Sequence, residues 1–233
     1  MANPKTASRE EWLEARLALL EQEKALTRQR DAVSAARRKL PRVKIDKDYR
    51  FQSEAGEETL ADLFEGRSQL IVQHFMFGED WNEGCKSCSL MAENYDGVIP
   101  HLGQRDVSLV AISHAPLDKL IAFRERMGWG FKWVSSLGSD FNVDFDVSYS
   151  EEEVQNEVYY NYRMTRFPMT EAPGMSVFAL DADGSVYHTY SCYGRGLDPL
   201  MGTYQYLDLV PKGRDEDNLS YGMEWVRHHD KYQ

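Results

Sequence analysis

Leu70-Ile71-Val72-Gln73-His74-Phe75-Met76-Phe77 is followed by Gly78-Glu79-Asp80-Trp81-Asn82-Glu83-Gly84 and then by Cys85-Lys86-Ser87-Cys88. The first segment predicts a buried strand, because a dense apolar run suits a strand that is covered on both faces. The second segment predicts a loop, and helical sequence resumes at Cys85 and continues toward Leu102. The two cysteines are therefore expected where a strand, a loop and the start of a helix meet.

Strands and helices continue to alternate outward from this stretch. The elements expected on either side are a helical turn at 60–64, a strand at 107–113, a helix at 116–127, a short strand at 132–135, a β-hairpin at 176–190 and a helix at 199–209. The hairpin is predicted from Asp181-Ala182-Asp183-Gly184, a turn sequence between two apolar segments. Residues 139–166 are acidic, aromatic and irregular.

This order of elements predicts an α/β protein with a mixed central sheet that is flanked by helices. Strand–helix alternation indicates parallel strands, and the terminal hairpin adds antiparallel ones. A Cys-x-x-Cys motif that opens the first helix after a strand makes the order similar to a thioredoxin-like fold.

An N-terminal helical extension is expected before this domain. Residues 9–39 lack Gly and Pro, and Ser8 with Glu11 forms the pattern of a capping box. We expect the helix to pack on its own domain or on a second subunit in a homodimer. The predicted domains are the helical extension at 1–41, the thioredoxin-like domain at 42–211 and a polar C-terminal tail at 212–233.

Composition narrows the class of protein. The 233 residues include 27 Lys and Arg against 38 Asp and Glu, a net charge of −11 that disfavours nucleic acid as a partner. No apolar run approaches the roughly 18–20 residues of a membrane span, and no secretory signal is visible. Three cysteines do not suit a secreted disulfide scaffold. A cytoplasmic location is expected, with no membrane partner.

The cysteine pair is the candidate catalytic site. Amide groups at a helix start favour a thiolate at Cys85, which would attack a disulfide, and Cys88 would resolve the mixed intermediate. Lys86 favours that thiolate, whereas Glu79, Asp80 and Glu83 oppose it. Lys86 and Trp81 are the candidate substrate-binding residues, although Trp81 could also simply pack. The expected substrate is a thiol or disulfide, on a protein or a small molecule, and no cofactor is expected.

Other interpretations of the same residues remain open. One is a thiol peroxidase that uses Cys85, and another is a non-catalytic binding protein on the same scaffold. A copper site could combine Cys85 and Cys88 with His114 or His188, whereas zinc lacks a second Cys-x-x-Cys. Cys192 is expected to be a packed side chain or a second redox residue. Arg195 between two glycines could bind an anion or close a turn.

Several longer motifs resemble a known family. They are Phe75-Met76-Phe77-Gly78-Glu79-Asp80-Trp81, Gly84-Cys85-Lys86-Ser87-Cys88-Ser89, Arg126-Met127-Gly128-Trp129, Gly138-Ser139-Asp140-Phe141-Asn142, His188-Thr189-Tyr190-Ser191 and Tyr206-Leu207-Asp208-Leu209 with Pro211-Lys212-Gly213-Arg214. Together they resemble the bacterial family called domain of unknown function 899, also labelled a predicted dithiol-disulfide oxidoreductase. The resemblance implies a thioredoxin-like fold and thiol–disulfide activity at Cys85 and Cys88.

The chain departs from these relatives at two places. The family commonly has Pro after the first Cys, whereas this chain has Lys86. This difference leaves the reduction potential of the cysteine pair open. The chain also looks like a distant relative of peroxiredoxins. When the chain is aligned with these relatives, Met175 stands where thioredoxins have a cis-Pro and where many peroxiredoxins have an Arg. In the same alignment Pro173 lies two residues too early to match the cis-Pro. The resemblance therefore implies that substrate docking differs from thioredoxin and gives peroxide activation less support.

Overall fold

The computed structural model describes residues 5–233, which fall into two compact units, 5–41 and 42–233. The first unit is built on one helix, α1 (Arg9–Arg37). The hydroxyl of Ser8 accepts the amide N–H of Glu11, and the Glu11 carboxylate accepts the amide N–H of Ser8. The predicted capping box is thus confirmed, and the helix ends two residues earlier than predicted, in a turn.

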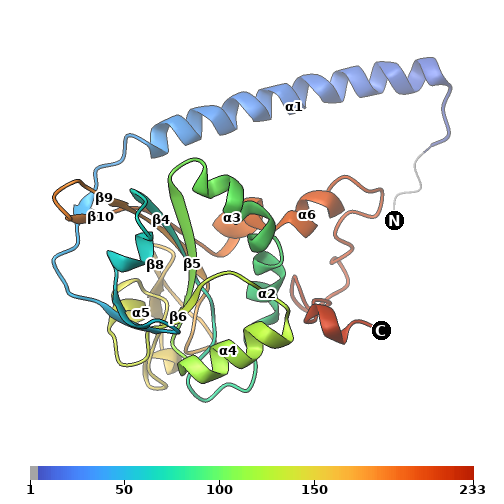
Figure 1. Ribbon diagram of the computed structural model, residues 1–233. Coiled ribbons are helices and arrows are strands. Elements are labelled where there is room, and N and C mark those ends of the chain that lie inside the picture. The colour runs from blue at the N-terminus through green and yellow to red at the C-terminus, as the bar shows by residue number, and fades with distance from the viewer. Residues whose placement is uncertain (1–4) are drawn as a thin grey trace. The chain divides into compact units, whose positions relative to one another are not determined.

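An eight-stranded mixed sheet organises the second unit (Figure 1). In spatial order its strands are β1 (Val43–Lys44), β10 (Val186–Tyr193), β9 (Gly174–Leu180), β4 (Gln69–His74), β5 (Val107–Ser113), β6 (Trp133–Ser135), β2 (Arg50–Ser53) and β3 (Gly56–Thr59). A separate two-stranded sheet pairs β7 (Val158–Tyr160) with β8 (Arg163–Thr165).

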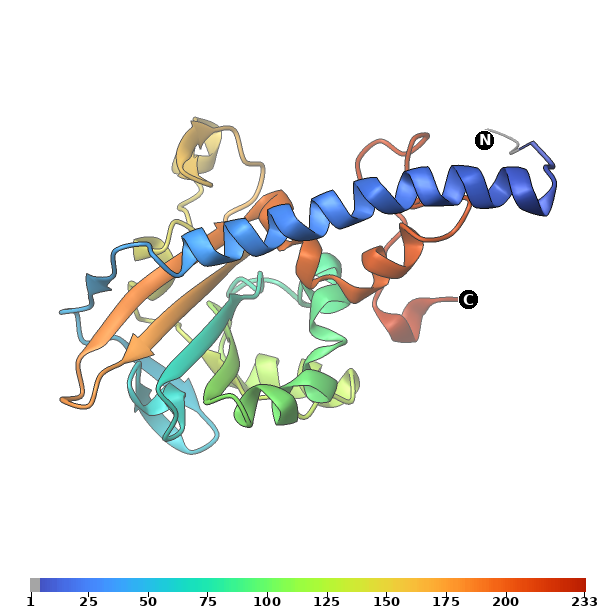
Figure 2. The same ribbon diagram turned by 90° about the horizontal axis from the view of Figure 1, so that it is seen from above.

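Four neighbouring strands form the thioredoxin-like core. Strands β4 and β5 are parallel, β9 is antiparallel to β4 on its other side, and β10 pairs with β9. Figure 2 shows the β9–β10 hairpin in orange beside β4 in teal. The crossover from β4 to β5 carries two helices, and the cysteine motif opens the first of them. The predicted α/β thioredoxin-like fold is confirmed by this arrangement.

Helices cover both faces of the sheet. They are α2 (Lys86–Ala92), α3 (Tyr95–Gly103), α4 (Leu117–Arg126), α5 (Phe141–Asp144) and α6 (Gly202–Leu207), with 3₁₀ helices at Asp62–Phe64, Glu153–Gln155, Gly194–Leu200 and His229–Lys231. Successive residues of β4 point to opposite faces: Ile71 packs in the cluster with α2 to α4, whereas Leu70 and Val72 join the cluster around α5. The sheet therefore has a core on each side.

Several boundaries differ from the predictions. Strand β5 coincides with the predicted segment, but β4 ends at His74, three residues early. The helix predicted from Cys85 breaks between α2 and α3, and the region at 139–166 contains α5 and the β7–β8 hairpin. Strands β1 to β3 were not predicted. Among residues 5–233, no helix has both the length and the apolar character needed to cross a membrane.

Candidate active site at the cysteine pair

Cys85 lies at the N-cap of α2, on the loop that follows β4. Its amide donates a 3.0 Å hydrogen bond to the carbonyl of Met76, which holds the turn against the end of the strand. Gly84 precedes it in a confined place, because a Cβ there would lie 2.7 Å from the Phe75 ring. The local sequence thus fixes where Cys85 enters the helix, as the strand–loop–helix pattern predicted.

The two cysteine sulfurs differ in environment. Both thiols are free; Cys85 is partly exposed and Cys88 is buried. A hydrogen bond from the Cys88 thiol lowers the pKa of Cys85 to about 7 against the opposing effect of burial, with further help from the amides of Cys88 and Ser87 and from the Lys86 charge. The same hydrogen bond, together with burial, raises the pKa of Cys88 well above its usual value. The pair therefore offers one nucleophilic sulfur and one protonated sulfur.

The acidic residues of the loop before Cys85 disfavour its thiolate less than the sequence indicates. The Glu83 carboxylate forms ion pairs with Arg126 and Lys231, both at 2.6 Å, and these pairs lower the pKa of Glu83. Lys231 belongs to the C-terminal segment, so the loop charge is balanced by a residue 148 positions away. The Cys85 thiolate therefore faces a loop whose nearest acid in sequence is already neutralised.

The C-terminal segment also contacts the backbone of the site. The buried ring of His228 donates a 2.9 Å hydrogen bond through Nε2 to the carbonyl oxygen of Gly84. Arg126 lies 3.3 Å from the other ring nitrogen, and Val226 is fully buried nearby in sequence. The polar composition of this segment gave no sign of a structural role at the cysteine loop, and sequence analysis missed it.

A cavity of about 400 Å³ opens beside the cysteines. Cys85 and Cys88 both line it, and five methionines form much of its surface: Met76, Met91, Met169, Met201 and Met223. We call these five residues the methionine wall. Tyr160, Phe167, Pro173 and Leu197 complete the apolar part, and the methionines come from five separate segments of the chain.

The two candidate substrate-binding residues are not among those that line this cavity. Trp81 is half-buried, packs against the core beneath the loop, and its carbonyl accepts a hydrogen bond from Lys119. The Lys86 ammonium donates a 3.3 Å hydrogen bond to the Glu224 carbonyl and lies over the Tyr221 ring. Their part in substrate binding stays a prediction.

Pro173, rather than Met175, lines the cavity that both cysteines line. Pro173 immediately precedes β9 and lines the cavity, and its carbonyl accepts the Tyr160 hydroxyl at 2.7 Å. Met175 is buried within β9, where it pairs in register with Cys192 of β10. The residue at the cavity is thus the proline that the sequence register placed two positions early. The β-strand pairing sets this position, and the motif spacing did not reveal it.

The residues considered for copper are not brought together. His114 pairs with Glu171 at 3.3 Å, and His188 hydrogen-bonds Ser191 at 2.7 Å. Within residues 5–233, no group of three or more His, Cys, Asp or Glu side chains is placed to hold a metal ion. The copper set built on Cys85 and Cys88 is therefore wrong.

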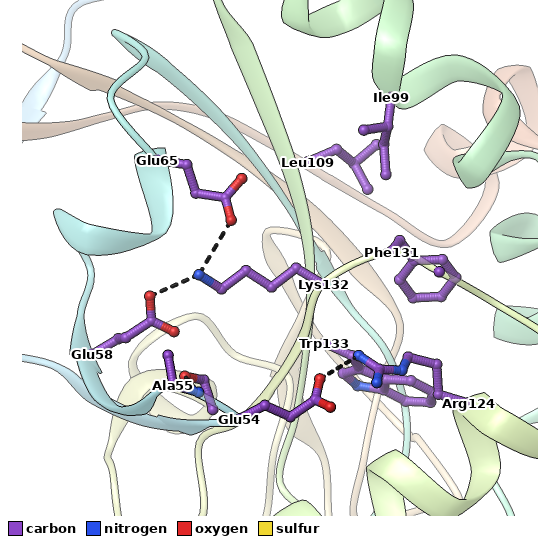
Figure 3. Close-up of a pocket in the computed structure, with 12 residues that line it drawn as sticks. Glu54, Ala55, Glu58, Glu65, Ile99, Leu109, Arg124, Phe131, Lys132 and Trp133 are labelled. Carbon is purple, nitrogen blue, oxygen red and sulfur yellow. Dashed lines mark hydrogen bonds and ion pairs between the residues drawn. The ribbon is translucent and has the colours of Figure 1, made fainter.

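A second cavity, of about 410 Å³, lies elsewhere in the same unit (Figure 3). Lys132 points between two carboxylates, at 2.7 Å from Glu58 and 3.3 Å from Glu65, and Arg124 pairs with Glu54 at 2.7 Å. Its cationic side chains are thus paired with acids from the cavity itself, and none of its lining residues is a cysteine. The chemistry of the chain points to the cavity at the cysteines instead.

A family model described as a bacterial protein of unknown function, DUF899, matches residues 1–232. The chain belongs to the DUF899 family. The resemblance stated from the motifs is thereby confirmed, and no curated protein matches this DUF899 chain in sequence. Within the DUF899 match, Lys86 follows the first cysteine, and its charge is a small cause of the lowered pKa of Cys85.

Solved structures similar to this DUF899 protein include two peroxiredoxin-type proteins and one interchange protein. A PrxQ mutant of Xylella fastidiosa has 10% identity and a TM-score of 0.45, covering 71% of this chain and 94% of its own. The peroxidoxin BcpB of Mycobacterium tuberculosis has 14% identity and a TM-score of 0.47, covering 72% and 97%. A Chlorobium tepidum protein assigned as a thiol:disulfide interchange protein DsbE has 12% identity and a TM-score of 0.42, covering 66% and 86%. All three TM-scores lie below 0.5, so the fold assignment rests on the strand order.

Proposed function

We propose that this protein is a thiol–disulfide oxidoreductase in which Cys85 attacks and Cys88 resolves. The observation that supports it most is the hydrogen bond between a partly exposed, low-pKa Cys85 and a buried, high-pKa Cys88. At pH 7 about half of Cys85 is thiolate, whereas Cys88 keeps its proton until the mixed disulfide has formed.

The reaction transfers two electrons from the dithiol to a disulfide substrate. The Cys85 thiolate attacks one substrate sulfur, the substrate S–S bond breaks, and the first thiolate product leaves and takes a proton from water. Attack has consumed the Cys85 charge that raised the Cys88 pKa, so Cys88 then loses its proton and attacks Cys85. The second product leaves as a thiolate, and an external dithiol reductant restores the enzyme.

The surroundings favour a disulfide over a peroxide as the substrate. A peroxide oxygen needs hydrogen-bond donors as it departs, and two polar side chains that line the cavity already have partners. The Tyr160 hydroxyl donates to Pro173, and Arg195 pairs with Asp198 at 2.8 Å. Departing thiolates need less assistance, because their conjugate thiols have pKa values of roughly 8.5.

A redox titration of the full chain in mixtures of reduced and oxidised dithiothreitol tests the proposal. We expect a reversible two-electron couple in the wild type and in Cys192→Ser, and none in Cys85→Ser or Cys88→Ser. Peptide mapping after alkylation should assign the disulfide to residues 85 and 88. An unreactive wild-type pair, or a disulfide that involves Cys192, would refute the assignment.

A further inference from the structure

We infer that the substrate sulfur carries an apolar group, which enters the cavity beside Cys85 and packs against the methionine wall. This inference rests on the proposed function and adds the substrate class. It is supported by the position of both cysteines on the surface of one cavity of about 400 Å³, a size typical of small-molecule sites.

The cavity has the chemistry of an adaptable apolar site. Methionine side chains are flexible and polarizable, so they fit apolar groups of irregular shape and also contact sulfur favourably. Met169 is 40% exposed, which leaves an apolar side chain at the surface where a substrate can reach it. Burying this surface gives a direct gain for a substrate with an alkyl or aromatic substituent.

The less exposed polar groups of the cavity already have partners. The Tyr160 hydroxyl donates to Pro173 and accepts the Gly194 amide at 3.0 Å. Asp198 is held by Arg195 and by Arg214 at 2.9 Å. A charged group that packs among the five methionines would lose its water without a new partner, at a cost that selects against it. The same cavity thus attracts apolar substituents and discriminates against ionic ones.

The test uses mixed disulfides of cysteine with ethanethiol, butanethiol and hexanethiol. Cys85 attacks the sulfur that carries the alkyl chain, cysteine leaves as its thiolate, and Cys88 then releases the alkanethiol. The enzyme ends as the Cys85–Cys88 disulfide and the substrate as two thiols, so the electrons balance. Loss of free enzyme thiol, measured by quenched alkylation and mass spectrometry, gives the second-order rate constant for each chain length.

We expect the rate constant to rise about fourfold per added methylene while the chain still fits the cavity. The dependence on chain length should be shallower in Met169→Gln, and the matched variant Met164→Gln, whose side chain is exposed on β8 outside the cavity, should keep the wild-type dependence. Equal rates for all chain lengths, with a normal disulfide as product, would overturn only the substrate class. Failure to form the disulfide with every substrate would instead overturn the proposed function.

A separate observation concerns α1. We propose that this helix pairs antiparallel with α1 of a second copy of the chain. None of its described residues is buried, and large apolar side chains recur every seven residues at Trp12, Leu19, Leu26 and Val33. A strict seven-residue repeat is the pattern of a helix–helix seam.

Three positions after each of these large residues lies a smaller or polar one: Ala15, Gln22, Gln29 and Ala36. These four residues form the second row of the seam. In an antiparallel pair each large residue can face one of these, so that Trp12 meets Ala36 of the second copy and Val33 meets Ala15. At the two ends of the seam a large side chain faces an alanine, which allows close packing there.

Charge favours the antiparallel direction. Residues 9–23 hold two basic and five acidic side chains, a net charge of −3, whereas residues 25–37 hold three basic and one acidic, a net charge of +2. Antiparallel pairing places the acidic half of one helix on the basic half of the other, whereas parallel pairing would oppose like charges.

Light scattering or sedimentation of the full chain under reducing conditions tests the pairing. We expect twice the 26.9 kDa chain mass, and a dissociation constant that rises at least about tenfold in Leu19→Glu but little in Leu17→Glu, an exposed leucine off the seam. Raising salt from about 0.05 to 0.5 M should weaken the dimer, because it screens attractive charges. A monomer, a dimer indifferent to Leu19→Glu, or one strengthened by salt would overturn the proposal.

Discussion

The Cys88 thiol donates a hydrogen bond to the Cys85 sulfur, and this contact is the first cause of the lowered pKa of Cys85, about 7. The hydrogen bond stabilises the thiolate, whereas burial alone would raise the pKa. In Cys88→Ala the donor is lost, so the pKa of Cys85 should rise and its alkylation at pH 7 should slow about fivefold. Iodoacetamide rates measured against pH give the pKa directly.

Two further variants control this prediction. Cys88→Ser keeps a hydroxyl donor, so it should raise the pKa of Cys85 less than Cys88→Ala does. Cys192→Ser should leave the pKa of Cys85 at the wild-type value. Equal alkylation profiles in Cys88→Ala and the wild type would show that the amides at the helix start, rather than Cys88, hold the thiolate.

The Lys86 charge is a smaller cause of the same shift. Lys86→Met should therefore raise the pKa of Cys85 by less than Cys88→Ala does. Added salt should raise the pKa of Cys85 in the wild type more than in Lys86→Met, because it screens the ammonium but not the hydrogen bond. Alkylation rates measured against pH at low and high salt give both effects. A larger rise of the Cys85 pKa in Lys86→Met than in Cys88→Ala would show that the Lys86 charge outweighs the hydrogen bond.

Gly84 is tested by adding a single methyl group. A Cβ at this position would lie 2.7 Å from the Phe75 ring and 3.2 Å from Phe123, so Gly84→Ala should lower the free energy of unfolding by about 1–3 kcal/mol. The matched variant Gly97→Ala lies in α3 with no atom within 4 Å of the added Cβ, and it should be neutral or stabilising by up to about 1 kcal/mol. Urea denaturation measures both; a neutral Gly84→Ala would mean that the loop has room to move.

Local patterns were sufficient for the parts of the fold that depend on neighbours in sequence. Strand β5 was predicted in full because six of its seven residues are buried and the segment is largely apolar. Cys85 was placed at a helix start because the strand, loop and helix patterns around it are all local in sequence. Strand β2 (Arg50–Ser53) was missed because only alternate residues are buried and its sequence is largely polar.

The parts that depend on distant segments could not be predicted. His228 reaches Gly84 across 144 residues, from a segment whose composition looks like solvated chain. The methionine wall likewise gathers residues from positions 76 to 223, none of which forms a motif with another. Spacing in sequence carries no record of such contacts, because the sheet order brings them together only once the fold is formed.

A buried chain of hydrogen bonds crosses three strands on the α5 side of the sheet. His74 Nε2 lies 2.7 Å from the Ser176 hydroxyl, Ser176 lies 2.7 Å from Ser191, and Ser191 lies 2.7 Å from His188 Nε2. The other ring nitrogen of His74 is buried without a hydrogen-bond partner. Burial lowers the pKa of His74 to about 3, so the ring is neutral in the folded protein at all but strongly acidic pH.

His74 should make stability depend on pH in a defined direction. Because its pKa is lowered on folding, the unfolded chain binds a proton that the folded chain does not, and stability present above about pH 6.5 is lost as pH falls toward 3. The slope from this one group is at most about 1.4 kcal/mol per pH unit. Urea denaturation between about pH 4 and 6 should therefore show a shallower slope in His74→Gln than in the wild type or in His101→Gln, an exposed histidine. An NMR titration of the wild type tests the same point without the variant, in case His74→Gln folds poorly. The His74 ring should stay unprotonated at pH 5. Protonation of that ring near pH 6 would contradict the burial argument.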